Sequence, residues 1–108
     1  MSIYTENGTA TSTPWGISQH SKQLARGIMR YDTATHGGYH LTQSRVNQLP
    51  PSLRAIIPFA GNGWYEEDCD WCIVALAFPA LFSQYPDIQE IALATLKHYH
   101  PKAYANYV

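Results

Sequence analysis

The stretch Ile28–Leu41, IMRYDTATHGGYHL, decides the fold class because it predicts a β-hairpin. Residues Ile28–Thr33 combine β-branched and aromatic side chains, which are typical of a strand. Gly37 and Gly38 follow, and paired glycines between two such segments are common in tight reversals. Tyr39–Leu41 would then run back beside the first strand. We expect a hairpin whose turn contains the two glycines and has a polar tip.

After the hairpin the sequence changes to helical patterns. Thr42 is a residue type that caps helix N-termini, and Pro50 with Pro51 must end the short helix that it begins. A second short turn would follow at Ser52–Arg54. From Glu66 onward, apolar residues recur at steps of three or four, which predicts a helix. This apolar stripe comprises Trp71, Val74, Ala75, Phe78 and Phe82.

Prolines divide the C-terminal half into segments. Pro79 removes a helical hydrogen bond, so the helix should end or kink near Phe78 and continue as a turn up to Phe82. Pro86 begins the next helix and Pro101 ends it, with a last short helix after that. The buried stripe of the helix between them is expected to contain Ile88, Ile91, Ala92, Leu96 and Tyr99.

The order of these elements predicts an α+β fold: a short antiparallel β-hairpin or small sheet followed by three to four helices packed on one face. A two-stranded hairpin alone is marginally stable, and residues Trp15–Lys22 would supply a third strand. Residues 1–13 are rich in Ser, Thr, Asn and Gly, which predicts a flexible N-terminal arm. Residues 14–108 have the length of a single globular domain.

Composition argues against several classes of partner. The chain has 108 residues, of which 45% are apolar and 14% charged, and its formal net charge is -1. A nearly neutral chain offers no basic surface to phosphates, which argues against direct binding of nucleic acid. No apolar run is long enough to span a membrane, and the first residues do not resemble a signal peptide. We therefore expect a cytoplasmic protein with no membrane partner and no cofactor.

A second informative stretch is Trp64–Cys72, WYEEDCDWC, which gathers four carboxylates. We expect Glu66, Glu67 and Asp68 in the first turn of a helix, where negative side chains complement the free N–H groups. Glu66 and Asp70 would then share one helix face and repel each other unless a cation or donor lies between them. The candidates for that partner are His36, Arg30 and Arg54.

Cys69 and Cys72 form a CxxC pattern, but we expect neither a redox pair nor a metal site. The βαβ order around thioredoxin-like sites is missing, and the neighbouring carboxylates disfavour a thiolate. A structural zinc site also needs a second pair of ligands. The pairs that the sequence offers are His36 with His40, where two intervening glycines oppose the helix that would bring the rings together, and His98 with His100, which suit the negative end of a helix.

The stretch Thr35–Gly38, THGG, has chemical potential of its own. Two glycines let a ligand approach the backbone, and His36 beside a carboxylate would form a general acid/base pair. The alternative for this stretch is a plain turn with a polar tip. Trp15 and Gln19 also have two interpretations, because they would either bind a partner or anchor a loop. The residues considered for binding are Trp15, Gln19, His36, Gly37, Gly38, Glu66, Glu67 and Asp70. The candidates for catalysis are His36, Glu66, Glu67 and Asp70, without a committed assignment.

Four motifs together resemble a known family. They are TPWG at Thr13–Gly16, THGG at Thr35–Gly38, WYEEDCDW at Trp64–Trp71 and ALAFP at Ala75–Pro79. Their order resembles that of an uncharacterised family, a domain of unknown function found in phage, plasmid and other mobile-element accessory genes. The resemblance spans Thr13–Tyr104 and implies no catalytic residue. It does imply a context, because small proteins of such elements often bind a host protein, for example as inhibitors of restriction or CRISPR immunity.

The sequence therefore predicts a small mobile-element accessory protein that acts by protein–protein binding, as an inhibitor of host defence of the anti-CRISPR or anti-restriction type. The expected partner is a host or element-encoded protein, and a homodimer through Tyr99, Tyr104 and Tyr107 is an alternative. The rival hypothesis is a small hydrolase or transferase in which His36 acts with Glu66, Glu67 or Asp70.

Overall fold

The chain folds around a four-stranded antiparallel sheet in the computed structural model, which describes residues 4–5 and 8–108. In their order across the sheet, the strands are β5 (His20–Ala25), β6 (Ile28–Asp32), β7 (Gly37–Leu41) and β8 (Trp64–Glu66). The register pairs Ile28 with Leu41, so the hairpin predicted from this stretch is confirmed. The third strand expected at Trp15–Lys22 exists as β5, displaced toward the C-terminus.

Two short pairs of strands precede this sheet among the described residues. They are β1 (Tyr4–Thr5) with β2 (Gly8–Thr9), and β3 (Ser12–Thr13) with β4 (Gly16–Ile17). The buried hydroxyl of Ser18 closes the second pair, because it accepts a hydrogen bond of 2.8 Å from the Thr11 N–H. The predicted flexible arm, residues 1–13, includes positions outside the described residues, and its boundary at residue 13 stays a prediction.

The helical half contains one long helix and several short ones. The elements are α1 (Gln43–Val46), α2 (Pro51–Arg54), α3 (Trp71–Ala77), the 3-10 helix η1 (Pro79–Phe82), α4 (Ile88–Tyr99) and α5 (Pro101–Tyr107). Thr42 caps α1 as predicted, because its hydroxyl accepts the Arg45 N–H at 3.3 Å. Prolines open α2, η1 and α5, a position where the missing N–H costs no helical hydrogen bond.

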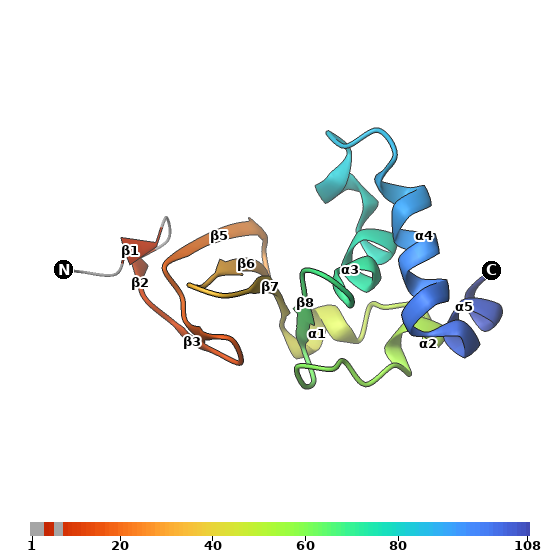
Figure 1. Cartoon of the computed structure of the whole chain (residues 1–108), viewed down its shortest axis with the longest axis horizontal. Helices are drawn as coiled ribbons and strands as arrows, with labels where there is room; N and C mark the ends of the chain where they lie inside the picture. Colours follow the sequence, from red (N-terminus) through yellow and green to blue (C-terminus); the bar gives the residue numbers. More distant parts are fainter. Residues whose placement is uncertain (1–3, 6–7) are drawn as a thin grey trace.

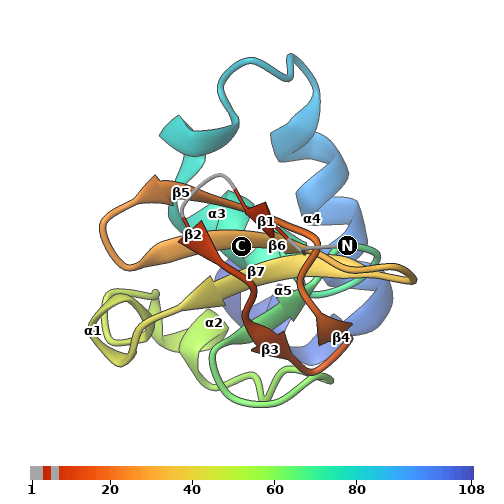
Figure 2. The same ribbon diagram turned by 90° about the vertical axis from the view of Figure 1, so that its left-hand side faces the viewer.

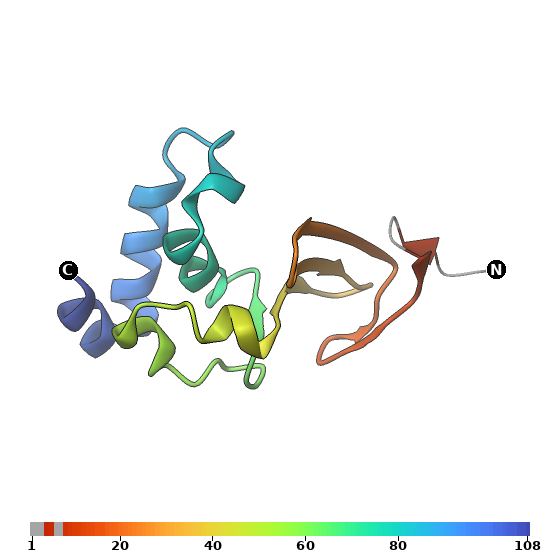
Figure 3. The same ribbon diagram turned by 180° about the vertical axis from the view of Figure 1, so that it is seen from behind.

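The helices cover one face of the four-stranded sheet, and the short N-terminal strands lie toward the other (Figures 1 and 2). Helix α3 contacts β7, β8 and α4, and its residues 72–76 are all buried. Ile28, Leu41 and Tyr65 meet them from the sheet. Seen from behind, α2 lies beside α5 (Figure 3). The α+β fold with helices on one face of a small sheet is confirmed.

Among the described residues, we find no helix with the length and apolar character that crossing a membrane requires.

The turn of the hairpin corrects one prediction. It is formed by Thr33–His36, where the Thr33 N–H and hydroxyl both donate to the His36 carbonyl, at 2.8 and 2.7 Å. Gly37 and Gly38 lie inside β7, and neither has a positive φ. The glycines are therefore required by close packing on the strand and not by the turn. A glycine with a positive φ, Gly27 at 83°, makes the turn between β5 and β6 instead.

The acidic stretch corrects a second prediction. Glu66 is the last residue of β8, and α3 begins only at Trp71, so no acidic residue lies in the first turn of α3. Trp64 and Tyr65 pair with His40 and Tyr39 of β7, and this pairing extends the chain through Glu66. Glu66 and Asp70 consequently do not share a helix face.

Helix α4 has a narrower buried stripe than predicted. Ala92 and Leu96 are completely buried. Ile91 and Tyr99 are 51% and 41% exposed, because α3 and α5 cover only part of the helix. The exposed Tyr99 lines a cavity at the C-terminal end of α4.

Candidate functional site

Three segments that are far apart in the sequence meet on the sheet, and we call this place the motif junction: Trp15, His36–Gly38 and Trp64–Asp68. The Trp15 and Trp64 rings meet edge to face, with centroids 5.8 Å apart. The Trp15 ring also covers Gly38 so closely that a side chain there would collide with it. The TPWG, THGG and WYEED motifs are therefore parts of one structure.

An aromatic group completes the face of the sheet turned away from the helices. The Trp64 ring lies 5.7 Å from Tyr31 and 4.4 Å from His40, measured between centroids. Burial lowers the pKa of His40, so this imidazole favours its neutral form. These contacts are in line with an anchoring role for Trp15, and its role in binding a partner stays a prediction. Gln19 has an exposed side chain, and its backbone N–H donates to the Asp32 carbonyl at 2.7 Å.

Arg30 holds the end of the sheet together by bridging two carboxylates. Its Nη2 lies 2.7 Å from Asp32 Oδ1 and 2.6 Å from Glu67 Oε1. The guanidinium also lies over the Tyr39 ring, 5.0 Å from the centroid. A side chain on Gly37 would lie 2.7 Å from Arg30 Nη2, so this glycine leaves room for the bridge.

His36 meets the acidic stretch directly. Its Nδ1 lies 3.3 Å from Glu66 Oε2, where the side chains are 53% and 14% exposed. The imidazole and the carboxylates of Glu66, Glu67 and Asp68 can place one ligand atom each within 4.8 Å of one another. We call Asp32, Glu66, Glu67 and Asp68 the acidic cluster. Such a set of oxygens and one imidazole nitrogen suits a positively charged group.

Asp70 lies apart from this cluster, although only one residue separates it from Asp68. Its carboxylate is completely buried, and Oδ1 lies 2.6 Å from His100 Nε2. The other oxygen, Oδ2, accepts the Phe59 N–H at 2.8 Å. The partner of Asp70 is therefore His100, and the rival hypothesis that pairs Asp70 with His36 loses its geometric basis.

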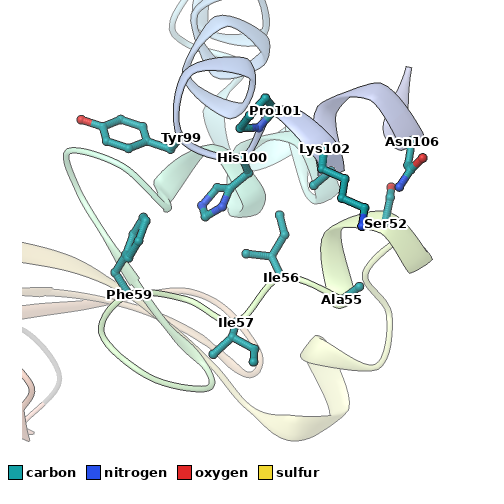
Figure 4. A pocket seen from close by; sticks show the side chains of 11 residues that line it. Ser52, Ala55, Ile56, Ile57, Phe59, Tyr99, His100, Pro101, Lys102 and Asn106 are labelled. Carbon is teal, nitrogen blue, oxygen red and sulfur yellow. The ribbon is translucent and has the colours of Figure 1, made fainter.

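His100 lines a cavity of about 600 Å³ between α2, the loop that follows it, and the junction of α4 with α5 (Figure 4). The Phe59 ring stacks on the imidazole, with centroids 5.3 Å apart and an interplanar angle of 24°. The volume of this cavity is in the range of small-molecule sites. The sequence around His100 suggests only a zinc ligand or a charge at a helix end. Its real partner is 30 positions away, and no local pattern indicates it.

The two cysteines have environments that oppose redox chemistry. Both are free; Cys72 is buried in α3 and Cys69 is half-buried. Burial, followed by the charge of Asp70, raises the pKa of each thiol to about 12. The expectation that this CxxC is not a redox pair is in line with these environments, because a reactive cysteine needs a lowered pKa.

Slow alkylation of the native protein is therefore expected. At pH 8, iodoacetamide should modify Cys69 and Cys72 at least about a hundredfold more slowly than an ordinary thiol, since the thiolate is scarce, and the rate should rise as pH increases. Mass spectrometry of quenched samples measures the rate, with the urea-unfolded chain as control. Rapid modification of the native chain at pH 8 would contradict the raised pKa values.

Comparison with known proteins identifies a family and nothing more. A family model described as Domain of unknown function (DUF7007) matches residues 8–108. No curated protein matches the chain, and no solved structure does. The match covers every motif of the junction as well as Asp70 and His100.

Proposed function

We propose that this chain, which belongs to the DUF7007 family, is a cytoplasmic accessory protein of a mobile genetic element that acts by binding another protein. The acidic cluster supports this proposal. It contains four carboxylates and one guanidinium, that of Arg30, which leaves three negative charges when the neighbouring His20 and His36 are neutral. Exposed charge of one sign favours a partner of the opposite sign and accelerates the encounter.

The proposed partner is a host or element-encoded protein with a basic nucleic-acid-binding surface. Such surfaces carry dense Lys and Arg side chains that normally meet phosphates. Carboxylates held at the end of a rigid sheet compete with phosphates for them, which is how an inhibitor of the anti-CRISPR or anti-restriction type would act. The net charge of the whole chain is only -1, so the attraction must come from this local cluster.

Reversing the charge of Asp68 tests this proposal with little effect on the fold. Asp68 is exposed, and its carboxylate makes no hydrogen bond or ion pair with the described residues. We expect Asp68→Lys to weaken binding to a CRISPR effector or restriction complex of the host about tenfold, mainly through slower association. Surface plasmon resonance with the purified complexes measures the rates at several salt concentrations.

Asp87→Lys is the matched control, because Asp87 is also exposed but precedes α4, outside the cluster. It changes the net charge by the same amount and should leave binding unchanged. Binding that is equally weakened by both variants would mean that only the net charge matters. Binding that neither added salt nor Asp68→Lys weakens would overturn the role of the acidic cluster.

The contact between His36 and Glu66 favours a second candidate function, a small hydrolase or transferase. An imidazole 3.3 Å from a carboxylate is a general acid/base arrangement. The His36 side chain is half exposed, however, and it does not line the cavity beside His100. The test is whether the purified protein hydrolyses an ester or phosphodiester, and whether His36→Gln abolishes that activity. Loss of the activity in His36→Gln would support this candidate, and an unchanged activity would exclude it.

A further inference from the structure

The cavity beside His100 has polar groups at both ends and apolar walls between them. In Figure 4, Tyr99, His100 and Phe59 stand on one side, and the ends of Ser52, Lys102 and Asn106 gather on the other. Ile56 and Ile57 lie between the two sides. Ile57 and Phe59 are 85% and 67% exposed, so two large apolar side chains of the same cavity lie open to solvent. The polar groups at the two ends therefore define how an elongated ligand would lie along the cavity.

At the first end, Asp70 fixes the hydrogen-bonding role of His100. The buried carboxylate accepts two hydrogen bonds, from the Phe59 N–H and from His100 Nε2. A carboxylate cannot donate, so the proton of the neutral imidazole lies on Nε2 and Nδ1 carries a lone pair. Nδ1 makes no hydrogen bond with the described residues. It is therefore accessible, because every buried side-chain nitrogen or oxygen among these residues has a hydrogen-bond partner. In this neutral form the imidazole offers an acceptor of fixed position to a ligand in the cavity, whereas a protonated ring would donate from Nδ1 as well.

At the opposite end, Lys102 supplies a positive charge. Lys102 is exposed, and it forms no ion pair within the described residues. Ser52 and Asn106 lie beside it and add uncharged hydrogen-bonding groups. An ammonium group with two neutral polar neighbours recognises an anion, and a carboxylate accepts hydrogen bonds from all three.

We propose that this cavity binds a small amphiphilic acid. Its carboxylate would lie at Lys102, its apolar body would cover Ile56, Ile57 and Phe59, and a hydroxyl group at its far end would donate to His100 Nδ1. The site is independent of the acidic cluster, because Lys102 attracts a negative ligand whereas the cluster attracts a positive one. Small-molecule sites commonly combine such apolar walls with a few placed polar groups.

A series of para-hydroxyphenyl alkanoates, from the propionate to the pentanoate, tests the proposal. We expect one chain length to bind best and to shift the NMR signals of His100 and Phe59. Its primary amide, which lacks the charge, and its methoxy analogue, which lacks the donor, should each bind about tenfold more weakly. The substitution Lys102→Gln should weaken the acid about tenfold and leave the affinity for the amide unchanged. Lys22→Gln, an exposed lysine on β5, is the matched control and should change neither.

Three results would overturn the proposal. The first is the absence of saturable shifts with every acid at millimolar concentration while the protein remains folded. The second is equal affinity for the acid, the amide and the methoxy compound, which would indicate an adventitious apolar contact. The third is a shift of the same signals with protein concentration alone, which would assign the surface to a second copy of this chain.

Discussion

Replacing Gly38 with alanine is expected to lower the free energy of unfolding by about 3 kcal/mol, because overpacking a closed site forces its neighbours to move. The added methyl group would collide with the Trp15 ring and lie 2.5 Å from the Tyr65 carbonyl oxygen. The Trp15 ring is held against Trp64, and the carbonyl is part of β8. Neither can give way without disturbing the junction. Equilibrium unfolding in urea, followed by tryptophan fluorescence, measures the loss.

Gly37→Ala is the nearest control, one residue earlier on the same strand. Two of the atoms that its methyl group would meet, Arg30 Nη2 and Asp32 Oδ1, are the far ends of side chains, which can shift more readily than the packed Trp15 ring, and the third is the Tyr31 carbonyl oxygen at 2.9 Å. We expect a smaller loss than at Gly38. In addition, Trp15→Ala combined with Gly38→Ala should cost less than the sum of the single substitutions, since both act on one contact. A larger loss at Gly37, or simple additivity, would contradict this account.

The two glycines also show what the sequence can and cannot predict. The dipeptide Gly37-Gly38 has the same local chemistry in a tight turn and in a closely packed strand. The strands around it were predictable from their β-branched and aromatic residues. The position of the turn was not, because the contacts that leave no room for a side chain at Gly38, among them the Trp15 ring 23 positions away, are remote in the sequence.

The acidic stretch shows a second limit of the same kind. Acidic residues before an apolar stripe are typical of a helix N-terminus, and α3 does follow at Trp71. Pairing with β7 overrides this local preference and keeps Glu66 in a strand. The prolines were more informative, because Pro79 and Pro101 act through their own covalent structure, whatever lies nearby. The helix ends near both were correctly predicted.

One short segment connects the two sites that the structure describes. Glu66, Glu67 and Asp68 contribute their carboxylates to the end of the sheet, and Asp70 contributes its own to His100 on the helical side. Trp71 then begins α3, which packs between the sheet and α4. The acidic residues of WYEEDCDW therefore have two separate roles. Carboxylates that are partly or fully exposed lie at the cluster, and a completely buried one lies against an imidazole at the cavity.

Asp70→Asn should reverse the proton position on His100. The asparagine has almost the same shape, and its amide oxygen can still accept the Phe59 N–H. Its NH₂ group must then face His100 Nε2, which becomes an acceptor, so the proton moves to Nδ1. The corresponding substitution in a catalytic triad acts in the same way, by selecting the wrong tautomer. The ring nitrogen chemical shifts of the neutral imidazole report which nitrogen carries the proton.

The effect of Asp70→Asn on ligand preference can be distinguished from its effect on the free energy of unfolding. With Nδ1 protonated, we expect the hydroxyl-bearing acids to bind about tenfold more weakly and the methoxy analogues, which only accept, to lose nothing or to gain. The stability loss should be about 1 kcal/mol, compared with about 3 kcal/mol for Asp70→Ala, which leaves the Phe59 N–H and His100 without an acceptor. Asp68→Asn makes the same chemical change on an exposed carboxylate and should alter neither the tautomer nor the ligand preference. If the proton stays on Nε2 in Asp70→Asn, the buried carboxylate does not set the polarity of the cavity, and its role is limited to packing.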